Sequence, residues 1–130
     1  MSRKLSDLTP EAQEKARLFT DAMLSAGIRF AITCTYRSQE EQNELWDRGR
    51  VTPGPKVTWS RVSKHTSRTA FDIVILKDNK AIWDIVKTDV NTNNIPDYEE
   101  AGVIGEGVGL EWGGRWAVKD AFHFQLKEAT

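Results

Sequence analysis

Apolar residues in the first part of the chain repeat first with a helical period and then with a strand period. Over residues 10–27 they fall on one helical face, and Thr9 and Pro10 have the properties of an N-cap and a first helical residue. The predicted apolar face consists of Leu18, Phe19, Ala22, Met23 and Ala26. Over residues 28–34 apolar residues alternate with others, which is typical of a half-buried strand. The pattern therefore predicts a helix followed by a strand, and the strand leads to Arg37.

A capping signal opens the next predicted helix. Residues 38–41 begin with serine and end with glutamate, which is the spacing of a capping box. We expect this helix to end near Gly49. Residues 50–63 contain a Pro-Gly-Pro sequence and few periodic apolar positions, so they predict a loop.

The second half of the chain predicts mainly strands. Residues 70–76 are typical of a central strand, and residues 77–80 of a turn into a partner strand at 81–83. A helix is expected over residues 96–102, and a last strand over residues 122–126. The expected fold class is α+β, with N-terminal helices packed on a small antiparallel sheet.

The composition fits one domain over residues 1–130 and excludes several kinds of partner. Hydrophobic residues make up 39% of the chain and charged residues 28%, which is typical of a soluble globular protein. The net charge of -1 gives no basic stripe, so we expect no nucleic-acid partner. The longest uncharged apolar run, residues 73–76, is far below the roughly 20 residues that cross a bilayer, and we expect no stable membrane association.

Two further features concern the compartment in which the protein is made. The positive charges that follow Met1 precede no apolar segment, so we expect no signal peptide and synthesis in a cytoplasm. Cys34 is the one cysteine of the chain, which excludes an internal disulfide. Its place in an alternating apolar stretch predicts a buried small hydrophobic residue rather than a nucleophile.

The chain has two histidines, and each lies near an acidic residue in the sequence. Asp72 follows His65, and Asp120 precedes His123. A catalytic zinc is usually held by three protein ligands, with a fourth position open to water. His65, Asp72 and His123 supply such a donor set, and Asp120 suits a general base beside it. Both spacings also occur around histidines that bind no metal, so the spacing alone leaves both interpretations open.

Four sequence blocks carry a resemblance to a known family. They are TYRSQEEQ at residues 35–42, SKHTSRTAFD at 63–72, EWGGRW at 111–116 and DAFHF at 120–124. In this order they resemble the zinc peptidases of the D-alanyl-D-alanine carboxypeptidase and dipeptidase family, over residues 28–126. The closest resemblance is to the small phage endolysins that cleave the L-alanyl-D-glutamate bond of peptidoglycan. Blocks in a shared order are more specific than any one block.

The resemblance implies a role for each residue of the site. His65, Asp72 and His123 would hold Zn²⁺, and Asp120 would be the catalytic base. Arg37 would stabilise the oxyanion of the tetrahedral intermediate, a contribution on the order of 3 kcal/mol for a typical oxyanion donor.

Several neighbouring residues have two interpretations each. Arg37 is either the oxyanion donor or a surface arginine beside the acidic start of the second helix. Ser63 is either a substrate or supporting contact or a simple loop hydroxyl, and Gln42 is either such a contact or a solvent-facing helix residue. Trp112 and Trp116 are expected in the core rather than in the site, because aromatic residues of small domains are mostly buried.

Two positions depart from the family's pattern. Arg68 stands where the family usually has glycine, and Phe122 where it usually has proline. If the glycine normally has a positive φ, arginine there costs on the order of 1 kcal/mol. All three ligands and the base are present, so we expect an active enzyme with an adapted loop. We also hypothesise that Arg68 pairs with a peptidoglycan carboxylate.

The expected function is that of a phage endolysin acting on the stem peptide of bacterial peptidoglycan. The protein would be a monomer, held in the host cytoplasm until a separate holin gives it access to the cell wall. Two alternatives stay open: a D-Ala-D-Ala carboxypeptidase or dipeptidase, and a non-catalytic wall-binding domain. The last would have lost a ligand or Asp120, and neither is lost. We expect residues 50–62 and 84–107 to build the cleft walls that select the scissile bond.

Overall fold

The computed structural model describes residues 1–128 of the chain. Three α-helices and five strands, with two short 3-10 helices, follow one another along it. In chain order the elements are η1 (Leu5–Asp7), α1 (Pro10–Ser25), β1 (Phe30–Cys34), α2 (Gln39–Asp47), β2 (Ala70–Lys77), β3 (Lys80–Ile82), α3 (Asp97–Gly107), β4 (Leu110–Trp112), η2 (Gly113–Arg115) and β5 (His123–Leu126).

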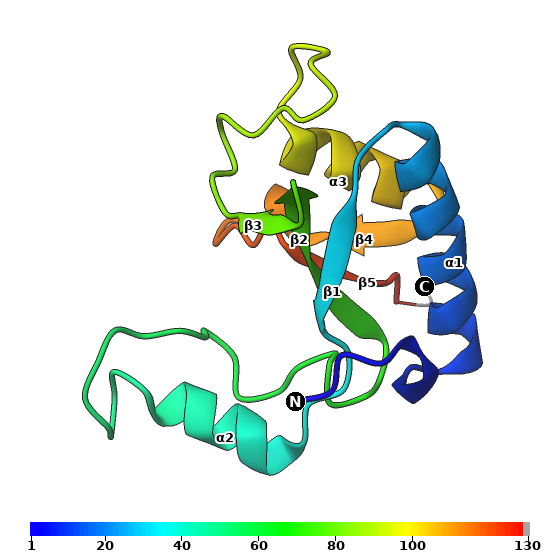
Figure 1. The fold of residues 1–130 in the computed structure, drawn as a ribbon. Helices are drawn as coiled ribbons and strands as arrows, with labels where there is room; N and C mark the ends of the chain where they lie inside the picture. Colours follow the sequence, from blue (N-terminus) through cyan, green and yellow to red (C-terminus); the bar gives the residue numbers. More distant parts are fainter. Residues whose placement is uncertain (129–130) are drawn as a thin grey trace.

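One antiparallel sheet forms the centre of the molecule. Its strand order is β1-β2-β5-β4, and β3 pairs with the end of β2. Helices α1 and α3 contact each other and pack on the sheet, whereas α2 and the loop after it extend to the opposite side from α1 (Figure 1). The expected α+β class with helices on an antiparallel sheet is confirmed. None of the helices in the described part of the chain has the length and apolar character that crossing a membrane requires.

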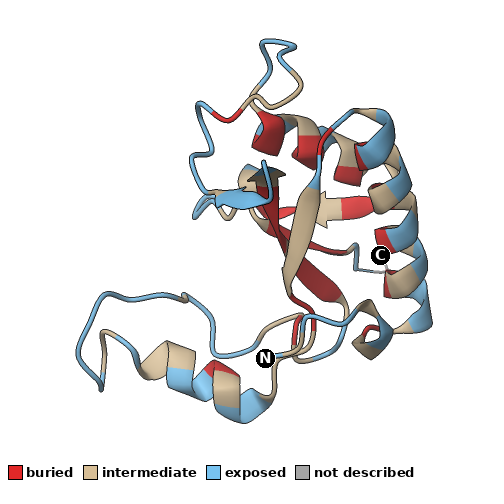
Figure 2. Ribbon diagram, viewed as in Figure 1, coloured by how far each residue is buried: buried red, intermediate tan, exposed pale blue. Residues whose placement is uncertain are grey.

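The core lies between α1, α3 and the sheet. Phe19 of α1 is fully buried, and its ring centroid lies within 5.6 Å of those of Phe30, Phe71 and Phe124. Buried residues accordingly concentrate on β2, β5 and the inward sides of the helices (Figure 2). The buried residues of α1 are Ala12, Ala16, Phe19 and Met23. The apolar face is therefore rotated from the predicted one, and the predicted members Leu18, Ala22 and Ala26 are only partly buried.

Local signals set most element ends as predicted. Thr9 accepts a hydrogen bond from the amide of Ala12, and the capping box between Ser38 and Glu41 is complete in both directions. The turn between β2 and β3 places Asp78 and Asn79 at φ 53° and 62°, as a two-residue hairpin turn requires.

The predicted end of the third helix is wrong. Helix α3 continues through Gly102 to Gly107, and strand β4 follows over residues for which the sequence predicted no element. A Cβ on Gly102 would lie 2.2 Å from the ring of Trp112. Glycine occupies this position because the helix packs closely on that ring, and it does not end the helix.

Candidate active site

The pairing of β2 with β5 brings the two sequence motifs together. Asp72 and His123 are register partners across this strand pair. Their side chains lie on the same face, and Asp72 Oδ1 is 2.9 Å from His123 Nδ1. Two residues far apart in the chain are thus joined by the sheet itself.

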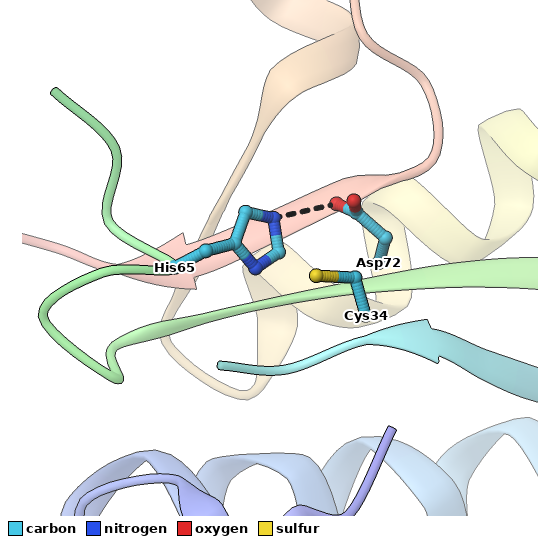
Figure 3. A group of neighbouring side chains, drawn as sticks. All are labelled: Cys34, His65 and Asp72. Carbon is cyan, nitrogen blue, oxygen red and sulfur yellow. Dashed lines mark ion pairs between the residues drawn. The ribbon is translucent and has the colours of Figure 1, made fainter. Parts of the chain in front are cut away.

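His65 reaches the same carboxylate because the chain turns back after it. The amides of Arg68 and Thr69 donate to the carbonyls of His65 and Lys64, which folds this segment into consecutive turns before β2. His65 Nε2 then lies 3.2 Å from Asp72 Oδ1 (Figure 3). Both histidines of the expected set therefore meet at Asp72, but the donor atoms of His65, Asp72 and His123 do not all lie within 4.8 Å of one another.

The surroundings of His65 fix which nitrogen faces the site. Its Nδ1 donates to the carbonyl of Thr35 at 2.9 Å, so in the neutral ring Nε2 carries the lone pair. His65 is 2% exposed, and Nε2 has no hydrogen-bond partner. A buried imidazole nitrogen without a donor, oriented by a backbone carbonyl on its other side, has the arrangement of a metal ligand.

His123 is oriented by a second chain of polar contacts. Its Nε2 lies 3.0 Å from Gln125 Oε1, and the Gln125 amide donates to Glu111 at 3.4 Å. Glu111 also accepts from the indole of Trp116 at 2.9 Å. Gln125 was not among the predicted site residues, although its position two residues after His123 on a predicted strand places both on one face.

The donor set fits zinc. Two imidazole nitrogens and one carboxylate are common ligands of catalytic zinc, and the unpartnered Nε2 of His65 supports the fit. In the described residues, two groups of ligand atoms are close enough to hold an ion, and both contain Asp72. One group adds Cys34 and His65, and the other adds Asp120 and His123.

Cys34 is buried as predicted, but its neighbours were not foreseen. Its thiol lies beside His65 and Asp72 (Figure 3), because β1 pairs Cys34 with Asp72 after a register shift that follows Ile32. A buried cysteine in an alternating strand has the same sequence pattern wherever it packs. The proximity depends on strand register and could not be predicted from the pattern alone.

The charges of the site influence one another strongly. Burial disfavours the ionised form of Asp72, but hydrogen bonds from His123 and His65 outweigh burial and lower the pKa of Asp72. Burial likewise disfavours protonated His65, yet its close contacts with Asp72 and Cys34 raise the pKa of His65 to about 10. Without a metal, the carboxylate thus attracts protons to the positions where a cation would bind.

Asp120 lies beside the site on the turn before β5. Its Oδ1 accepts from the amide of Phe122 at 3.2 Å, and its own amide donates to the carbonyl of Gly113 at 2.9 Å. A Cβ on Gly113 would lie 2.5 Å from the Asp120 carbonyl oxygen, so only glycine permits this close approach. Burial and the charge of Asp72 together raise the pKa of Asp120.

Arg37 is held toward the cleft by Gln42. Arg37 Nη1 donates to Gln42 Oε1 at 2.7 Å, and the Gln42 amide donates to the Ser60 carbonyl at 2.7 Å. Gln42 is 1% exposed, so its interpretation as a solvent-facing residue is wrong. Glu41 pairs with the ammonium group of Met1 rather than with Arg37.

Ser63 also lies at the site. Its hydroxyl accepts from the amide of His65 at 3.1 Å and lines the cleft. The side chain therefore shapes the turn that carries the histidine, while it stays accessible from the cleft.

The metal-site residues lie in an open cleft of about 1070 Å³. One wall is formed by the loop after α2, with Val57, Trp59 and Val62, and the other by residues that include Trp83 and Val118. This volume is at the upper end of ordinary ligand pockets and suits a peptide segment rather than a single small molecule. The expectation that residues 50–62 contribute a cleft wall agrees with this lining, whereas none of residues 84–107 lines the cleft, so the expectation for that segment is wrong.

Comparison with known proteins gives the family. The family model for D-alanyl-D-alanine carboxypeptidase matches residues 56–126. The peptidoglycan L-alanyl-D-glutamate endopeptidase CwlK of Bacillus subtilis (strain 168) is 37% identical over 125 residues, which cover 93% of this chain and 74% of CwlK. The chain belongs to the D-alanyl-D-alanine carboxypeptidase family.

A solved structure of similar fold supports the architecture. The L-Ala D-Glu endopeptidase ChiX of Serratia marcescens matches with a TM-score of 0.72 over 95% of this chain and 83% of ChiX. At 23% sequence identity, this similarity concerns the fold alone.

Arg68 replaces the glycine usual in the family without entering the site. It has a φ of 64°, which confirms that the position requires the left-handed region. Its guanidinium stacks 3.9 Å from the ring centroid of Tyr36 and donates to the Asp7 carbonyl at 3.0 Å. The side chain thus contacts the N-terminal segment, and it is not part of the cleft lining.

The aromatic residues near the family motifs divide between core and cleft. Trp112 is buried as predicted and donates to the Ala121 carbonyl. The prediction for Trp116 is wrong: it lines the cleft, with its ring centroid 5.1 Å from that of His123. Phe122, in place of the family proline, also lines the cleft and packs edge-on against Tyr98 and Trp83.

Proposed function

We propose that the protein is a zinc-dependent peptidoglycan peptidase that cleaves the L-Ala-D-Glu bond of the stem peptide. The observation that carries this proposal is the contact of one carboxylate, Asp72, with both His65 and His123 inside a peptide-sized cleft. The identity of 37% to CwlK across 93% of the chain supports the choice of bond.

The residues of the cleft have complementary chemical roles. Zn²⁺ held by His65, Asp72 and His123 would polarise the scissile carbonyl and lower the pKa of the attacking water. Asp120 would accept a proton from the attacking water and return it to the leaving amine. The pKa of Asp120 is raised, which brings its proton affinity closer to the proton affinities of the attacking water and of the leaving amine.

Arg37 would stabilise the charge that develops on the carbonyl oxygen. Its guanidinium lines the cleft and is held by Gln42, so little reorganisation is needed when the oxyanion forms. Lys119 lines the cleft, as does Lys64, which pairs with Glu128 at 2.7 Å. The positive charge of Lys119 favours a substrate with carboxylates, such as a stem peptide that contains D-glutamate.

The bond specificity can be tested on purified peptidoglycan. The zinc-loaded protein is incubated with cell walls, and the new peptide termini are identified by mass spectrometry. New amino-terminal D-Glu supports the proposal, whereas released D-Ala would assign the carboxypeptidase activity instead. Absence of any product, with a wild-type protein that holds zinc, would favour the wall-binding alternative. Asp120→Asn is the control, since it removes the base and leaves the ligands in place.

The biological setting is a separate part of the proposal. The endolysin branch of the resemblance implies that a holin releases the enzyme to the wall during phage lysis. Expression in a bacterial host with and without a holin tests this, and lysis that requires both proteins is the expected result. Sedimentation of the purified protein tests the expected monomer.

A further inference from the structure

The segment between β3 and α3 carries oxygen-bearing side chains at regular positions. Residues 89–100 have the sequence DVNTNNIPDYEE. Acidic or amide residues occupy positions one, three, five, nine and twelve of this segment, namely Asp89, Asn91, Asn93, Asp97 and Glu100. These are the side-chain ligand positions of a twelve-residue calcium loop, which uses a main-chain carbonyl at position seven and a glutamate at position twelve. As in such loops, a helix follows, and α3 begins at Asp97.

Position six of a calcium loop normally requires glycine for a sharp turn. Here the residue is Asn94, which adopts a φ of 66°. Asparagine tolerates this left-handed conformation better than other residues with a side chain. The departure from glycine therefore preserves the backbone shape that the loop needs.

The side chains of the segment are gathered together by mutual contacts. The two oxygens of Asp89 accept from the amides of Asn93 and Asn94, at 3.2 and 2.9 Å. Glu100 accepts from the side-chain amides of Asn91 and Asn93, at 3.2 and 2.6 Å. These contacts place carboxylates from both ends of the segment on one loop, but the carboxylates of Asp89, Asp97 and Glu100 do not all lie within 4.8 Å of one another, so an ion would have to draw them closer.

Two buried oxygen atoms in this loop have no hydrogen-bond partner. They are Asn91 Oδ1 and Asp97 Oδ1. Asp97 is fully buried, and its other oxygen accepts from the amide of Val90 at 2.6 Å. A buried carboxylate oxygen without a donor is costly unless a cation compensates it. Within residues 1–128, His65 Nε2 at the zinc site has the same property.

Nearby charges increase this cost. Burial raises the pKa of Asp97, and the negative charges of Asp89 and Glu100 add to the effect. The unpartnered carboxylate thus lies among other acids, in a loop whose described residues bring no lysine or arginine into the twelve positions. A divalent cation would satisfy the unpartnered oxygens and reduce the repulsion together.

We infer that residues 89–100 bind Ca²⁺. The ligands are the side chains of Asp89, Asn91, Asn93, Asp97 and Glu100, with the main-chain carbonyl of Ile95. The set contains only oxygen atoms, which favours Ca²⁺ over zinc, and its number matches the six to eight ligands of Ca²⁺ in a flexible loop. On binding, the amides of Asn91 and Asn93 turn their oxygens toward the ion, and the ion replaces their contacts with Glu100.

The position of the loop gives the ion a structural role. The segment follows Trp83, which lines the cleft, and it continues into α3, above which it projects (Figure 1). Bound Ca²⁺ therefore fixes the connection between the cleft residue Trp83 and α3, and stabilises the folded protein.

Thermal unfolding of the zinc-loaded protein during Ca²⁺ titration tests this inference. The melting temperature of the wild type should rise by several degrees and then saturate. Glu100→Gln and Asp89→Asn should each lose most of this rise, because each removes a charged ligand. Glu99→Gln is the matched control: it removes the same charge from an exposed neighbour on α3 and should keep the rise.

Terbium luminescence provides a second measurement on the same proteins. Tb³⁺ replaces Ca²⁺ at oxygen sites and is excited through nearby aromatic rings. We expect emission from the wild type and from Glu99→Gln that Ca²⁺ displaces, and little from Glu100→Gln. A wild type without a calcium-dependent shift would overturn the inference. So would an equal shift in Glu100→Gln, Asp89→Asn and Glu99→Gln, since that pattern indicates general charge screening. Neither outcome depends on peptidase activity.

Discussion

Asp72 Oδ1 lies 2.9 Å from His123 Nδ1, and this contact joins the central strand to the last strand. The same oxygen is 3.2 Å from His65 Nε2. One carboxylate therefore holds both imidazoles near each other before any ion binds. A neutral side chain of the same shape at position 72 would lack the negative charge that attracts a cation to the site.

Asp72→Asn should weaken zinc binding more than the roughly 10- to 100-fold typical of changes to outer-sphere partners. The amide keeps the shape of the side chain but removes the ionic ligand. Competition with a chromogenic chelator measures the affinity. Glu14→Gln, which removes the same charge from the exposed side of α1, is the control and should bind zinc as the wild type does. An unchanged affinity in Asp72→Asn would exclude Asp72 as a ligand.

Asp120→Asn should separate metal binding from catalysis. Asp120 lies beside the three ligands, and we expect its loss to reduce turnover by roughly 10²- to 10⁴-fold, the usual contribution of a general acid or base. Zinc affinity should stay close to that of the wild type. Release of soluble peptides from cell walls measures turnover, and the chelator assay measures zinc. Equal losses in both assays would instead make Asp120 a ligand.

Gln42→Leu should affect stability and catalysis together. The buried amide connects Arg37 to the Ser60 carbonyl, and leucine leaves both groups without their partner. Arg37 is partly buried and Ser60 is exposed, so water can replace part of the lost contacts, and the free energy of unfolding should fall by about 1 kcal/mol, the net contribution of a typical hydrogen bond. Turnover should also fall, because Arg37 loses the contact that orients it.

Urea unfolding and peptide release measure these two effects. Glu44→Gln on the exposed side of α2 is the matched control, and it should change neither quantity. If Gln42→Leu lowered stability while turnover stayed unchanged, Arg37 would not depend on Gln42 for its position.

Arg68→Gly and Arg68→Ala should differ in stability but not in activity. Both lose the stacking on Tyr36 and the hydrogen bond to Asp7. Only glycine also relieves the strain of a φ of 64°, so Arg68→Ala should be less stable than Arg68→Gly by about 1 kcal/mol. Urea unfolding measures the difference. A fall in zinc affinity or turnover in either variant would show that the Arg68 side chain supports the site after all.

Features with a local signal could be predicted from the sequence. The capping box at Ser38 and the turn at Asp78 and Asn79 each depend on a few adjacent residues, and both occur as expected. The end of α3 could not be predicted, because Gly102 is explained by its contact with Trp112, a residue of the next strand. Periodicity also gave the wrong rotation for α1, since the neighbouring helix and sheet decide which side is buried.

The site residues also divide into those with a sequence signal and those whose place depends on distant contacts. His65, Asp72, Asp120 and His123 occur in motifs with rare residue types, so their meeting could be predicted from the family resemblance. The place of Cys34 beside them depends on a register shift between β1 and β2, and no short pattern indicates it. The burial of Gln42 depends on a loop that folds back over α2, which amphipathicity alone does not indicate.

Asp97 should limit stability at neutral pH when no calcium is present. Its folded-state pKa is raised, mainly by burial, so the folded protein binds its proton more tightly than the unfolded chain does. The resulting stability is present at low pH and is lost as pH rises through the folded pKa. In Asp97→Asn the side chain has no charge at any of these pH values, so this loss of stability does not occur, and its amide oxygen can still accept from the amide of Val90. The variant should therefore be more stable than the wild type at neutral pH in calcium-free buffer.

The advantage of Asp97→Asn should shrink as pH falls from about 7 toward the ordinary carboxyl range near 4, because wild-type Asp97 then becomes protonated in the folded state. Urea unfolding of the zinc-loaded wild type and of Asp97→Asn across this pH interval measures the difference in their free energies of unfolding. Any stability that both proteins lose as pH falls cancels in this difference. Asp97→Ala separates charge from hydrogen bonding, since alanine cannot accept from Val90 and should gain less. Excess calcium should reverse the order, as only the wild type keeps the charged ligand. A difference that stays constant with pH would show that the Asp97 charge is not the cause.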